Sequence, residues 1–383
     1  MNEILQSVPF AVVLLVIGFV FLVKGADAFV EGCSSVAKRF HVPTLIIGMT
    51  IVAMGTSLPE TAVSITASIS GNNALAVSNA VGSNIFNLMV VVGVCAVLTP
   101  LAVQVGILKR DFPLSIACAI LLLILGAIDM TLGHVDGVVF IVLFAFFILY
   151  MIRSARNAGN GAEGEEDELL AEAKEMPVMS VPKSLIYIVA GGVAIALGSD
   201  WVVDGATTVA SAMGISQTLI GLTVVAFGTS LPELATSIVA AKKKEVDMAL
   251  GNVIGSNIFN ILMVLGIASA VSPVAFLTEN VIDIVILIIF SAIVWVLAWT
   301  KKELNRKEGI LMLILYAAYG RCIIREDGSY YEHPHWFELE KDKWAQVYKT
   351  TGTPCGCWMC RGFEYDRKEY KKETLRIIRE SME

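Results

Sequence analysis

Long apolar runs alternate with short polar segments along most of this chain. Ten runs approach the roughly 20 residues that an α-helix needs to cross a bilayer. They cover residues 8–29, 44–69, 74–99, 112–128, 134–152, 183–203, 217–241, 246–271, 279–299 and 308–320. With 56% hydrophobic residues and a mean hydropathy of +0.72, the chain has more apolar surface than a soluble domain can bury. We therefore predict an all-α polytopic membrane protein with ten transmembrane helices.

The basic residues indicate how these helices are oriented. Lys and Arg follow the first, third, fifth, seventh and ninth predicted helices, and the alternate loops have none. Because cytoplasmic loops collect Lys and Arg, the N-terminus is predicted to lie outside the cell. The loop at residues 153–182 is then cytoplasmic. Its acidic stretch EGEEDELLAEAKE is typical of a solvated linker, and a regulatory calcium site there is the less favoured alternative.

The chain also repeats itself at a fixed spacing, called the repeat offset below. The spacing that separates Glu60 from Glu233 also separates Gly82 from Gly255 and Asn87 from Asn260. Since each copy contains five predicted helices, an odd number, the second copy enters the membrane upside down. We predict two inverted five-helix repeats, residues 1–152 and 183–320. Such repeats are typical of secondary transporters with a site at the bilayer midplane.

The sequence GTSLPE occurs in both copies, at 55–60 and 228–233. Pro59 cannot donate a backbone hydrogen bond, and its ring clashes with the carbonyl of Gly55. The helix should therefore break within residues 53–58 and leave carbonyl oxygens free, which must face protein or a water-filled cavity. Glu60 then lies in the first turn of a second half-helix, where the helix dipole favours an ionised carboxylate. The second copy predicts the same for Glu233.

Polar residues accompany both motifs at helical spacing. The stripes are Ser57, Glu60 and Ser64; Asn79, Ser83 and Asn87; Ser230, Glu233 and Ser237; and Asn252, Ser256 and Asn260. Together they predict a cage of carboxylate, hydroxyl, amide and carbonyl oxygens, the ligands of hard cations such as Ca²⁺. A plain kink with polar interhelical contacts is the alternative, and two matching copies with a buried charge in each disfavour it. Asp27 and Asp200 are different: both fall near predicted helix ends, where Lys24 could pair with Asp27, so we expect them at the membrane interface.

GTSLPE followed by GSNIFN, twice in one chain, resembles the cation/calcium exchanger superfamily, specifically its prokaryotic sodium/calcium antiporters. The resemblance covers residues 4–320. It implies that the second, third, seventh and eighth helices form the ion-binding core, and that the first and sixth form a sliding, gating pair. Carried onto this chain, its Ca²⁺ ligands are Glu60, Glu233 and the carbonyls of Thr56 and Thr229. Its Na⁺ ligands are Ser57, Ser83, Ser230, Ser256 and the carbonyls of Ala53 and Ala226, with both glutamates shared and with Asn87 and Asn260 completing the central site.

The predicted function is secondary antiport of Ca²⁺ against Na⁺ across the cytoplasmic membrane by alternating access. A Ca²⁺/H⁺ or K⁺-dependent exchanger, a channel and a membrane-embedded enzyme are the alternatives. An enzyme is disfavoured because the chain has no H-E-x-x-H motif and no evident nucleophile–base pair. We expect a monomer in the lipid bilayer, with no nucleic-acid partner and no cofactor. With amides at Asn87 and Asn260, the central site carries two negative charges, which favours Na⁺ over H⁺ as the counter-ion.

Residues 321–383 resemble nothing in the exchangers and form an appended tail of unknown function. The tenth apolar run is cut short by Gly320 and Arg321. The tail brings Cys355, Cys357 and Cys360 together in CGCWMC, which could bind Zn²⁺, although uncommitted thiols are favoured because the spacing is not that of a standard zinc finger.

Overall fold

The computed structural model describes residues 8–69, 73–160, 179–213 and 226–323. The acidic stretch of the long loop and all of the tail beyond Ile323 lie outside these residues, and so do the three cysteines of CGCWMC. The predicted domain boundaries therefore stay predictions. The last helix, α18 (Arg306–Ile323), continues through Gly320 and Arg321, where the sequence had suggested that it stops.

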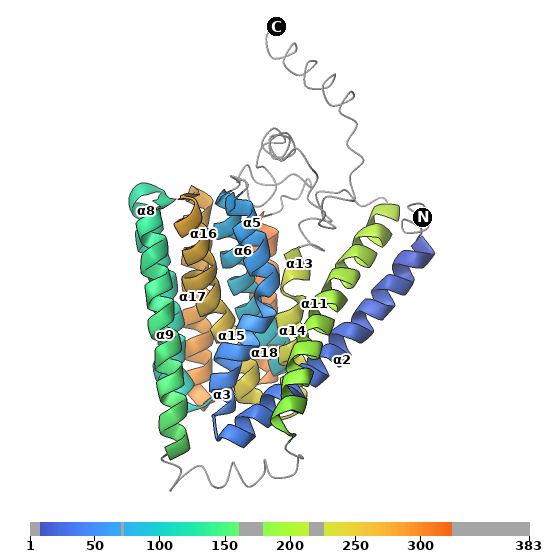
Figure 1. The fold of residues 1–383 in the computed structure, drawn as a ribbon. Helices are drawn as coiled ribbons and strands as arrows, with labels where there is room; N and C mark the ends of the chain where they lie inside the picture. Colours follow the sequence, from blue (N-terminus) through green and yellow to red (C-terminus); the bar gives the residue numbers. More distant parts are fainter. Residues whose placement is uncertain (1–7, 70–72, 161–178, 214–225, 324–383) are drawn as a thin grey trace. The chain divides into compact units, whose positions relative to one another are not determined.

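Helices make up almost all of the described chain (Figure 1). In the first half they are α2 (Val8–Phe40), α3 (Thr44–Ile47), the π-helix η1 (Gly48–Val52), α4 (Ala53–Thr56), α5 (Leu58–Ile69), α6 (Asn73–Phe86), the π-helix η2 (Asn87–Val91), α7 (Val92–Leu98), the π-helix η3 (Ile107–Asp111), α8 (Phe112–Asp129) and α9 (His134–Asn160). In the second half they are α11 (Val181–Ala212), α13 (Ala226–Thr229), α14 (Leu231–Lys242), α15 (Val246–Phe259), the π-helix η6 (Asn260–Val264), α16 (Leu265–Val271), α17 (Thr278–Lys301) and α18.

Seven of the described helical stretches are long and apolar enough to cross a membrane. An eighth is the bent pair Thr44–Thr56 and Leu58–Ile69, which meet at 48°. Of the two remaining predicted spans, 217–241 lies partly outside the described residues and 308–320 lies within α18. The all-α polytopic membrane class is therefore confirmed, and the number ten stays a prediction.

Helix boundaries recur at the repeat offset. The bounds of α4, α5, α6, η2 and α7, shifted by this offset, are those of α13, α14, α15, η6 and α16. Short strands then join the halves: β1 (Leu101–Ala102) pairs antiparallel with β4 (Glu303–Leu304), and β2 (Thr131–Leu132) pairs antiparallel with β3 (Val274–Ala275). Each strand pair takes one member from each half of the chain.

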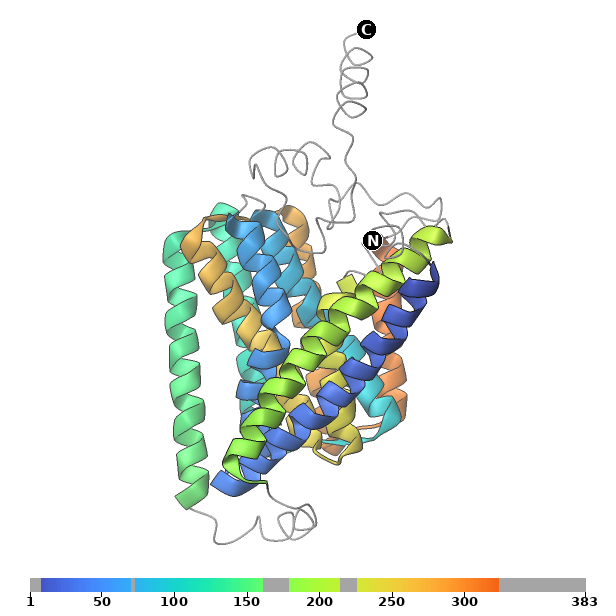
Figure 2. The ribbon, with the colours of Figure 1, turned by 45° about the vertical axis from the view of Figure 1, so that its right-hand side comes forward.

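Helices α2 and α11 pack along much of their length, as two views show (Figures 1 and 2). Glycine makes this possible. A Cβ atom added to Gly198 would lie 2.5 Å from the backbone nitrogen of Leu22 and 2.7 Å from the Gly18 carbonyl oxygen, and one on Gly191 would lie 2.8 Å from the Gly25 carbonyl oxygen. The two helices therefore meet backbone to backbone, the kind of contact that small residues permit in membranes.

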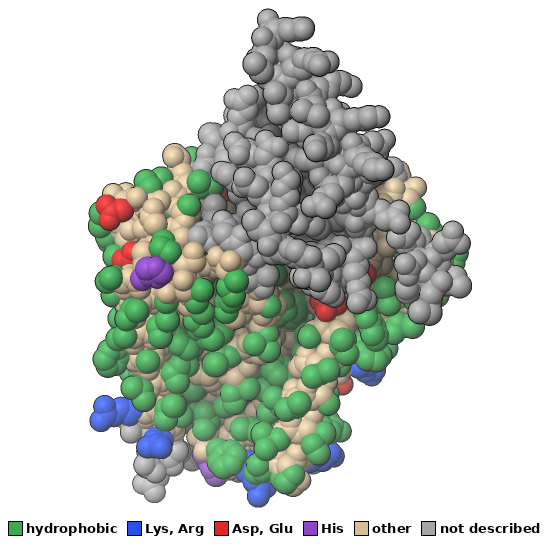
Figure 3. Space-filling view, turned by 45° about the horizontal axis from the view of Figure 1, so that its top comes forward, with side chains coloured by type: hydrophobic (Ala, Val, Ile, Leu, Met, Phe, Trp, Pro, Cys, Tyr) green, Lys and Arg blue, Asp and Glu red, His purple; other side chains and the backbone are tan. Residues whose placement is uncertain are grey.

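The third span and its counterpart in the second half lie innermost. In the spans Ala76–Leu98 and Val246–Val271, 78% and 83% of the most apolar window is buried, against 22% in His134–Arg156. Hydrophobic side chains predominate on the described part of the face in Figure 3, and Lys and Arg side chains lie near its lower edge. Such an apolar band is what a lipid-facing surface requires.

The expected pairing of Asp27 with Lys24 is wrong. Helix α2 continues to Phe40, so Asp27 lies well inside it, and its carboxylate is 2.7 Å from the Nζ atom of Lys243. The same Nζ atom is 3.9 Å from Glu31. Lys243 follows α14 in the second half of the chain, so local sequence could not predict this contact.

Candidate functional site

Each GTSLPE motif interrupts its helix at the serine. Ser57 has φ −85° and ψ 13°, and Ser230 has φ −95° and ψ 6°, outside the α-helical range. The ladder resumes directly afterwards, because the N–H groups of Thr61 and Leu234 bond to the carbonyls of these serines, each at 3.1 Å. The predicted break thus lies at Ser57 and its equivalent, and α5 and α14 begin one residue before the prolines.

The two motifs meet each other through their serines and glutamates. The Ser57 hydroxyl donates to Glu233 Oε1 at 3.0 Å, and the Ser230 hydroxyl donates to Glu60 Oε1 at 3.3 Å. All four side chains have 0% exposure. The second oxygen of each glutamate, Oε2, has no hydrogen-bond partner among the described residues. The motifs therefore bring together two carboxylates from opposite halves of the chain. Each carboxylate has one oxygen without a hydrogen-bond partner in the described residues.

Asparagines hold the half-helices that carry the glutamates. Asn79 Nδ2 donates to the Glu60 carbonyl at 3.3 Å and to Ser64 Oγ at 3.0 Å. Asn252 Nδ2 makes the equivalent bonds to the Glu233 carbonyl at 3.4 Å and to Ser237 Oγ at 2.9 Å. The polar stripes of neighbouring helices thus face each other, as their spacing predicts.

Thr56 connects the halves as well. Its hydroxyl lies 3.1 Å from Asn252 Oδ1 and also 3.1 Å from the Val52 carbonyl. Ala53 is fully buried, and its carbonyl accepts the Ser57 N–H at 3.0 Å. In the second half, Thr229 is half-buried and Ala226 is the first residue of α13. The predicted carbonyl ligands accordingly sit on α4 and α13, the short helices that precede the breaks.

The other predicted ligands come from the innermost helices. Ser83 is buried, with 4% exposure, and Ser256 has a buried hydroxyl without a partner in the described part of the chain. Asn87 and Asn260 have 0% exposure, and each is the first residue of a π-helix. π-Helical turns occur frequently at functional sites. Nothing in the sequence signalled these turns, because they have no residue signature.

Sequence reasoning missed further polar contacts. The Ser199 hydroxyl on α11 donates at 2.7 Å to the carbonyl of Gly228, the group that Pro232 leaves without an N–H partner. Asn84 and Asn257, one turn before the predicted amide ligands, bond to each other's backbone. The repeat offset pairs the two asparagines, so that periodicity was the signal that could have identified them.

The arrangement suits a hard cation. Five buried oxygens of the predicted ligands lack a hydrogen-bond partner within the described ranges: Oε2 of Glu60 and Glu233, Oδ1 of Asn87 and Asn260, and Oγ of Ser256. Leaving such atoms unpaired in a protein interior is costly, so a cluster of unpaired oxygens that includes two carboxylates indicates a place for a positive ion. Oxygen ligands with two carboxylates match Ca²⁺, while Na⁺ can use the same oxygens.

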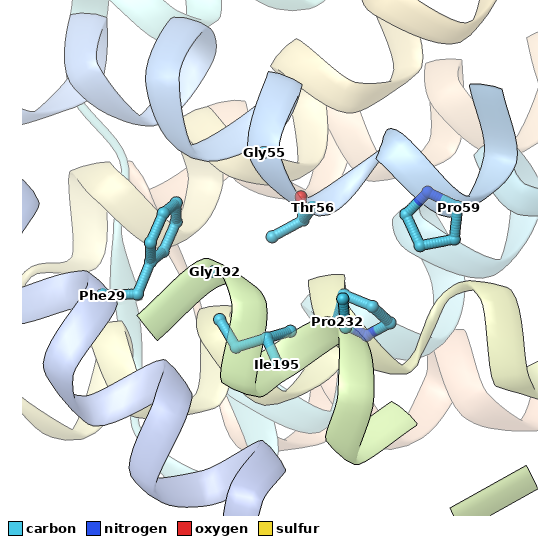
Figure 4. Close-up of a pocket in the computed structure, with 8 residues that line it drawn as sticks. Phe29, Gly55, Thr56, Pro59, Gly192, Ile195 and Pro232 are labelled. Carbon is cyan, nitrogen blue, oxygen red and sulfur yellow. The ribbon is translucent and has the colours of Figure 1, made fainter. Parts of the chain in front are cut away.

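A small cavity lies between the two helix breaks and the paired helices α2 and α11 (Figure 4). Both breaks contribute to it, and Phe29 lies opposite Gly55, where an added Cβ would be 3.0 Å from the ring. Its lining residues are Phe29, Gly55, Thr56, Pro59, Gly192, Ile195, Ala196 and Pro232. The paired helices thus cover the two breaks directly.

Fold and site together define a polytopic helical membrane protein whose buried core joins two glutamates from equivalent broken helices. The chain belongs to the sodium/calcium exchanger protein family, whose model matches residues 10–153 and 183–323. It is 33% identical over 336 residues to the sodium/calcium exchanger MaX1 of Methanosarcina acetivorans, covering 80% of this chain and 96% of MaX1. It is 36% identical over 293 residues to the inner membrane protein YrbG of Escherichia coli (strain K12), covering 74% of this chain and 89% of YrbG.

Among solved structures, the chain resembles the sodium-calcium exchanger NCX_Mj soaked with Na⁺ and Sr²⁺. The TM-score is 0.69 at 34% sequence identity, with 82% of this chain and 98% of NCX_Mj covered.

Proposed function

We propose that this protein is a secondary antiporter that exchanges Ca²⁺ for Na⁺ across the cytoplasmic membrane by alternating access. The observation that carries the proposal is the reciprocal contact of Ser57 with Glu233 and of Ser230 with Glu60. It joins two buried carboxylates beside the unpaired oxygens of the predicted ligands. The named activity of relatives such as MaX1 supports the same choice of ions.

In this proposal the cations are held by the twelve residues of the sequence prediction. Glu60, Glu233 and the carbonyls of Thr56 and Thr229 bind Ca²⁺; the serines 57, 83, 230 and 256 and the carbonyls of Ala53 and Ala226 add the Na⁺ ligands; Asn87 and Asn260 complete the centre. Burial of both glutamates supports this assignment, since an ionisable group inside a membrane protein is expensive and is usually kept for a function.

Alternating access requires two arrangements of similar free energy, and an inverted repeat supplies them. The recurrence of helix boundaries at the repeat offset supports ten helices in two inverted repeats. The distribution of Lys and Arg supports an N-terminus outside the cell, and the name of YrbG supports the inner membrane. We propose that one chain suffices, because both halves of the site lie in it.

The charge of the site determines how ion exchange depends on the membrane voltage. Two carboxylates are neutralised by one Ca²⁺ or by two Na⁺, and a third Na⁺ leaves the loaded site one charge more positive. Exchange of three Na⁺ for one Ca²⁺ therefore moves charge and responds to voltage, by about 2.3 kcal/mol per charge per 100 mV. Exchange of two H⁺ for one Ca²⁺ is electrically silent.

Flux measurements in vesicles test the proposal. The purified full chain is reconstituted, a Na⁺ gradient is imposed, and Ca²⁺ uptake is followed at clamped potentials. We expect uptake that needs the Na⁺ gradient and changes with voltage. Uptake that follows a pH gradient, ignores Na⁺ and is insensitive to voltage indicates the proton-coupled alternative, uptake without any counter-ion gradient indicates a channel, and the absence of flux contradicts transport.

A further inference from the structure

Asn84 and Asn257 lie where the buried helices α6 and α15 meet, and they are not among the proposed ligands. They are equivalent by the repeat offset, and their exposures are 0% and 3%. Asn84 Nδ2 donates to the Asn257 carbonyl at 3.1 Å, and Asn257 Nδ2 donates to the Asn84 carbonyl at 3.2 Å. These reciprocal bonds connect the innermost helices α6 and α15. The two bonds are equivalent by the repeat offset, so they are symmetric between the halves.

The side-chain oxygens of the two asparagines break this symmetry. Asn84 Oδ1 accepts a bond from Asn260 Nδ2 at 3.1 Å, a contact that we call an asparagine clamp. The equivalent clamp would run from Asn87 Nδ2 to Asn257 Oδ1. Neither of these two atoms has a hydrogen-bond partner within the part of the chain that the structure describes. One of the two asparagine clamps is therefore closed, and its counterpart is open.

A closed clamp determines what the amide offers to a cation. When Nδ2 of Asn260 is held by Asn84, the Oδ1 atom of Asn260 stays free as an acceptor, and it has no partner in the described residues. Asn87 is not held, so its amide can present either the oxygen or the NH₂ group. A cation binds the oxygen and is repelled by the NH₂ group. The clamp thus decides which amide is oriented as a ligand.

We propose that Asn84 and Asn257 are positioning residues for the cation site and that their two clamps close alternately. The Asn84–Asn260 clamp is closed in the state seen here, and the Asn257–Asn87 clamp closes in the state that opens to the opposite side of the membrane. The inference rests on the proposed antiport function. It follows from the equivalence of the halves, because exchanging their conformations exchanges the two clamps.

Kinetics from the two faces of the membrane test this proposal. Asn84→Leu and Asn257→Leu remove the amide at nearly constant size. Each variant loses the one reciprocal bond that its own side chain donates and keeps the other, so this equal loss cancels when the variants are compared. Asn280→Leu is the matched control, because Asn280 is also buried and donates to Ser78 Oγ at 2.9 Å on another helix pair. Asn→Ala variants at positions 84 and 257, which also lack the acceptor, replace the leucine variants if those fail to insert.

The measurement is the KM for Ca²⁺ at each face, in vesicles of sorted orientation. We expect Asn84→Leu to raise KM by about 2- to 13-fold at one face, the equivalent of one hydrogen bond, and Asn257→Leu to do so at the other face. The control should change both faces equally. If KM shifts equally at both faces in both variants, or does not shift, the alternation of the clamps is overturned. Na⁺-dependent flux in the wild type would still support antiport in that case. Absence of Na⁺-dependent flux in the wild type overturns both proposals.

Discussion

Replacing one glutamate by glutamine tests the charge balance of the site directly. Glu60→Gln or Glu233→Gln keeps the shape of a side chain with 0% exposure and removes one negative charge. One Ca²⁺ then leaves a net positive charge inside the membrane. Such a charge costs at least about 2.5–3.5 kcal/mol on the insertion scale, so Ca²⁺ binding should weaken by roughly 70- to 400-fold. We expect Ca²⁺ transport to be lost at micromolar Ca²⁺ in either variant.

These variants should lose Ca²⁺ affinity without losing thermal stability. Without a bound cation, two carboxylates share one buried site, so removing one charge lessens their repulsion and the variant should melt no lower than the parent in Ca²⁺-free buffer. Calorimetry in detergent measures Ca²⁺ affinity, and vesicle uptake measures transport at matched expression.

Glu245→Gln is the control for these measurements. Glu245 lies in the turn between α14 and α15, with Oε1 3.8 Å from Lys38 Nζ, and its replacement should leave affinity unchanged. A Ca²⁺ affinity within about tenfold of the parent in both Glu60→Gln and Glu233→Gln would refute the reasoning.

Three further predictions concern the surroundings of the site. Gly198→Ala should lower the melting temperature, with a loss of about 1–3 kcal/mol of stability, because the added Cβ would lie 2.5 Å from the Leu22 nitrogen. Gly192→Ala on the same helix is the control and should leave the melting temperature unchanged, since the nearest atom to its added Cβ is 3.7 Å away. With all seven native cysteines replaced, Glu166→Cys should react with an impermeant reagent only from the cytoplasmic side, and Asn72→Cys only from outside; external labelling at 166 contradicts the orientation. A chain ending at Ile323 should bind Ca²⁺ with unchanged affinity, because every proposed ligand precedes that residue; loss of binding despite normal insertion makes the tail part of the site.

Much of the core could be predicted from local chemistry. Pro59 has no N–H and therefore fixes the break, which the structure places at Ser57. The stripe from Asn79 to Asn87 follows helical spacing and faces the neighbouring half-helix, as the bond from Asn79 to Ser64 shows. Helical periodicity and proline geometry act within a few residues, so these features can be predicted without knowing the fold.

Contacts between distant segments could not be predicted in this way. Lys243 neutralises Asp27 from the other half of the chain, and a nearer lysine in the sequence was the wrong partner. Ser199 supplies the donor for the Gly228 carbonyl, although a single serine in an apolar helix carries no signal. The π-helices that begin at Asn87 and Asn260 change the local register, and no residue type marks them.

The asymmetry at the centre has a different origin. Two equivalent halves of a sequence can predict only a symmetric site, and the reciprocal bonds of Asn84 and Asn257 follow that symmetry. The bond from Asn260 to Asn84, without its counterpart at Asn87, does not. A protein that opens to one side at a time must be asymmetric in each of its states, and the side that is open belongs to the state rather than to the sequence. A contact that is present in one half and absent in the other, such as the bond from Asn260 to Asn84, therefore reports on the transport state. The repeated sequence cannot predict such a contact.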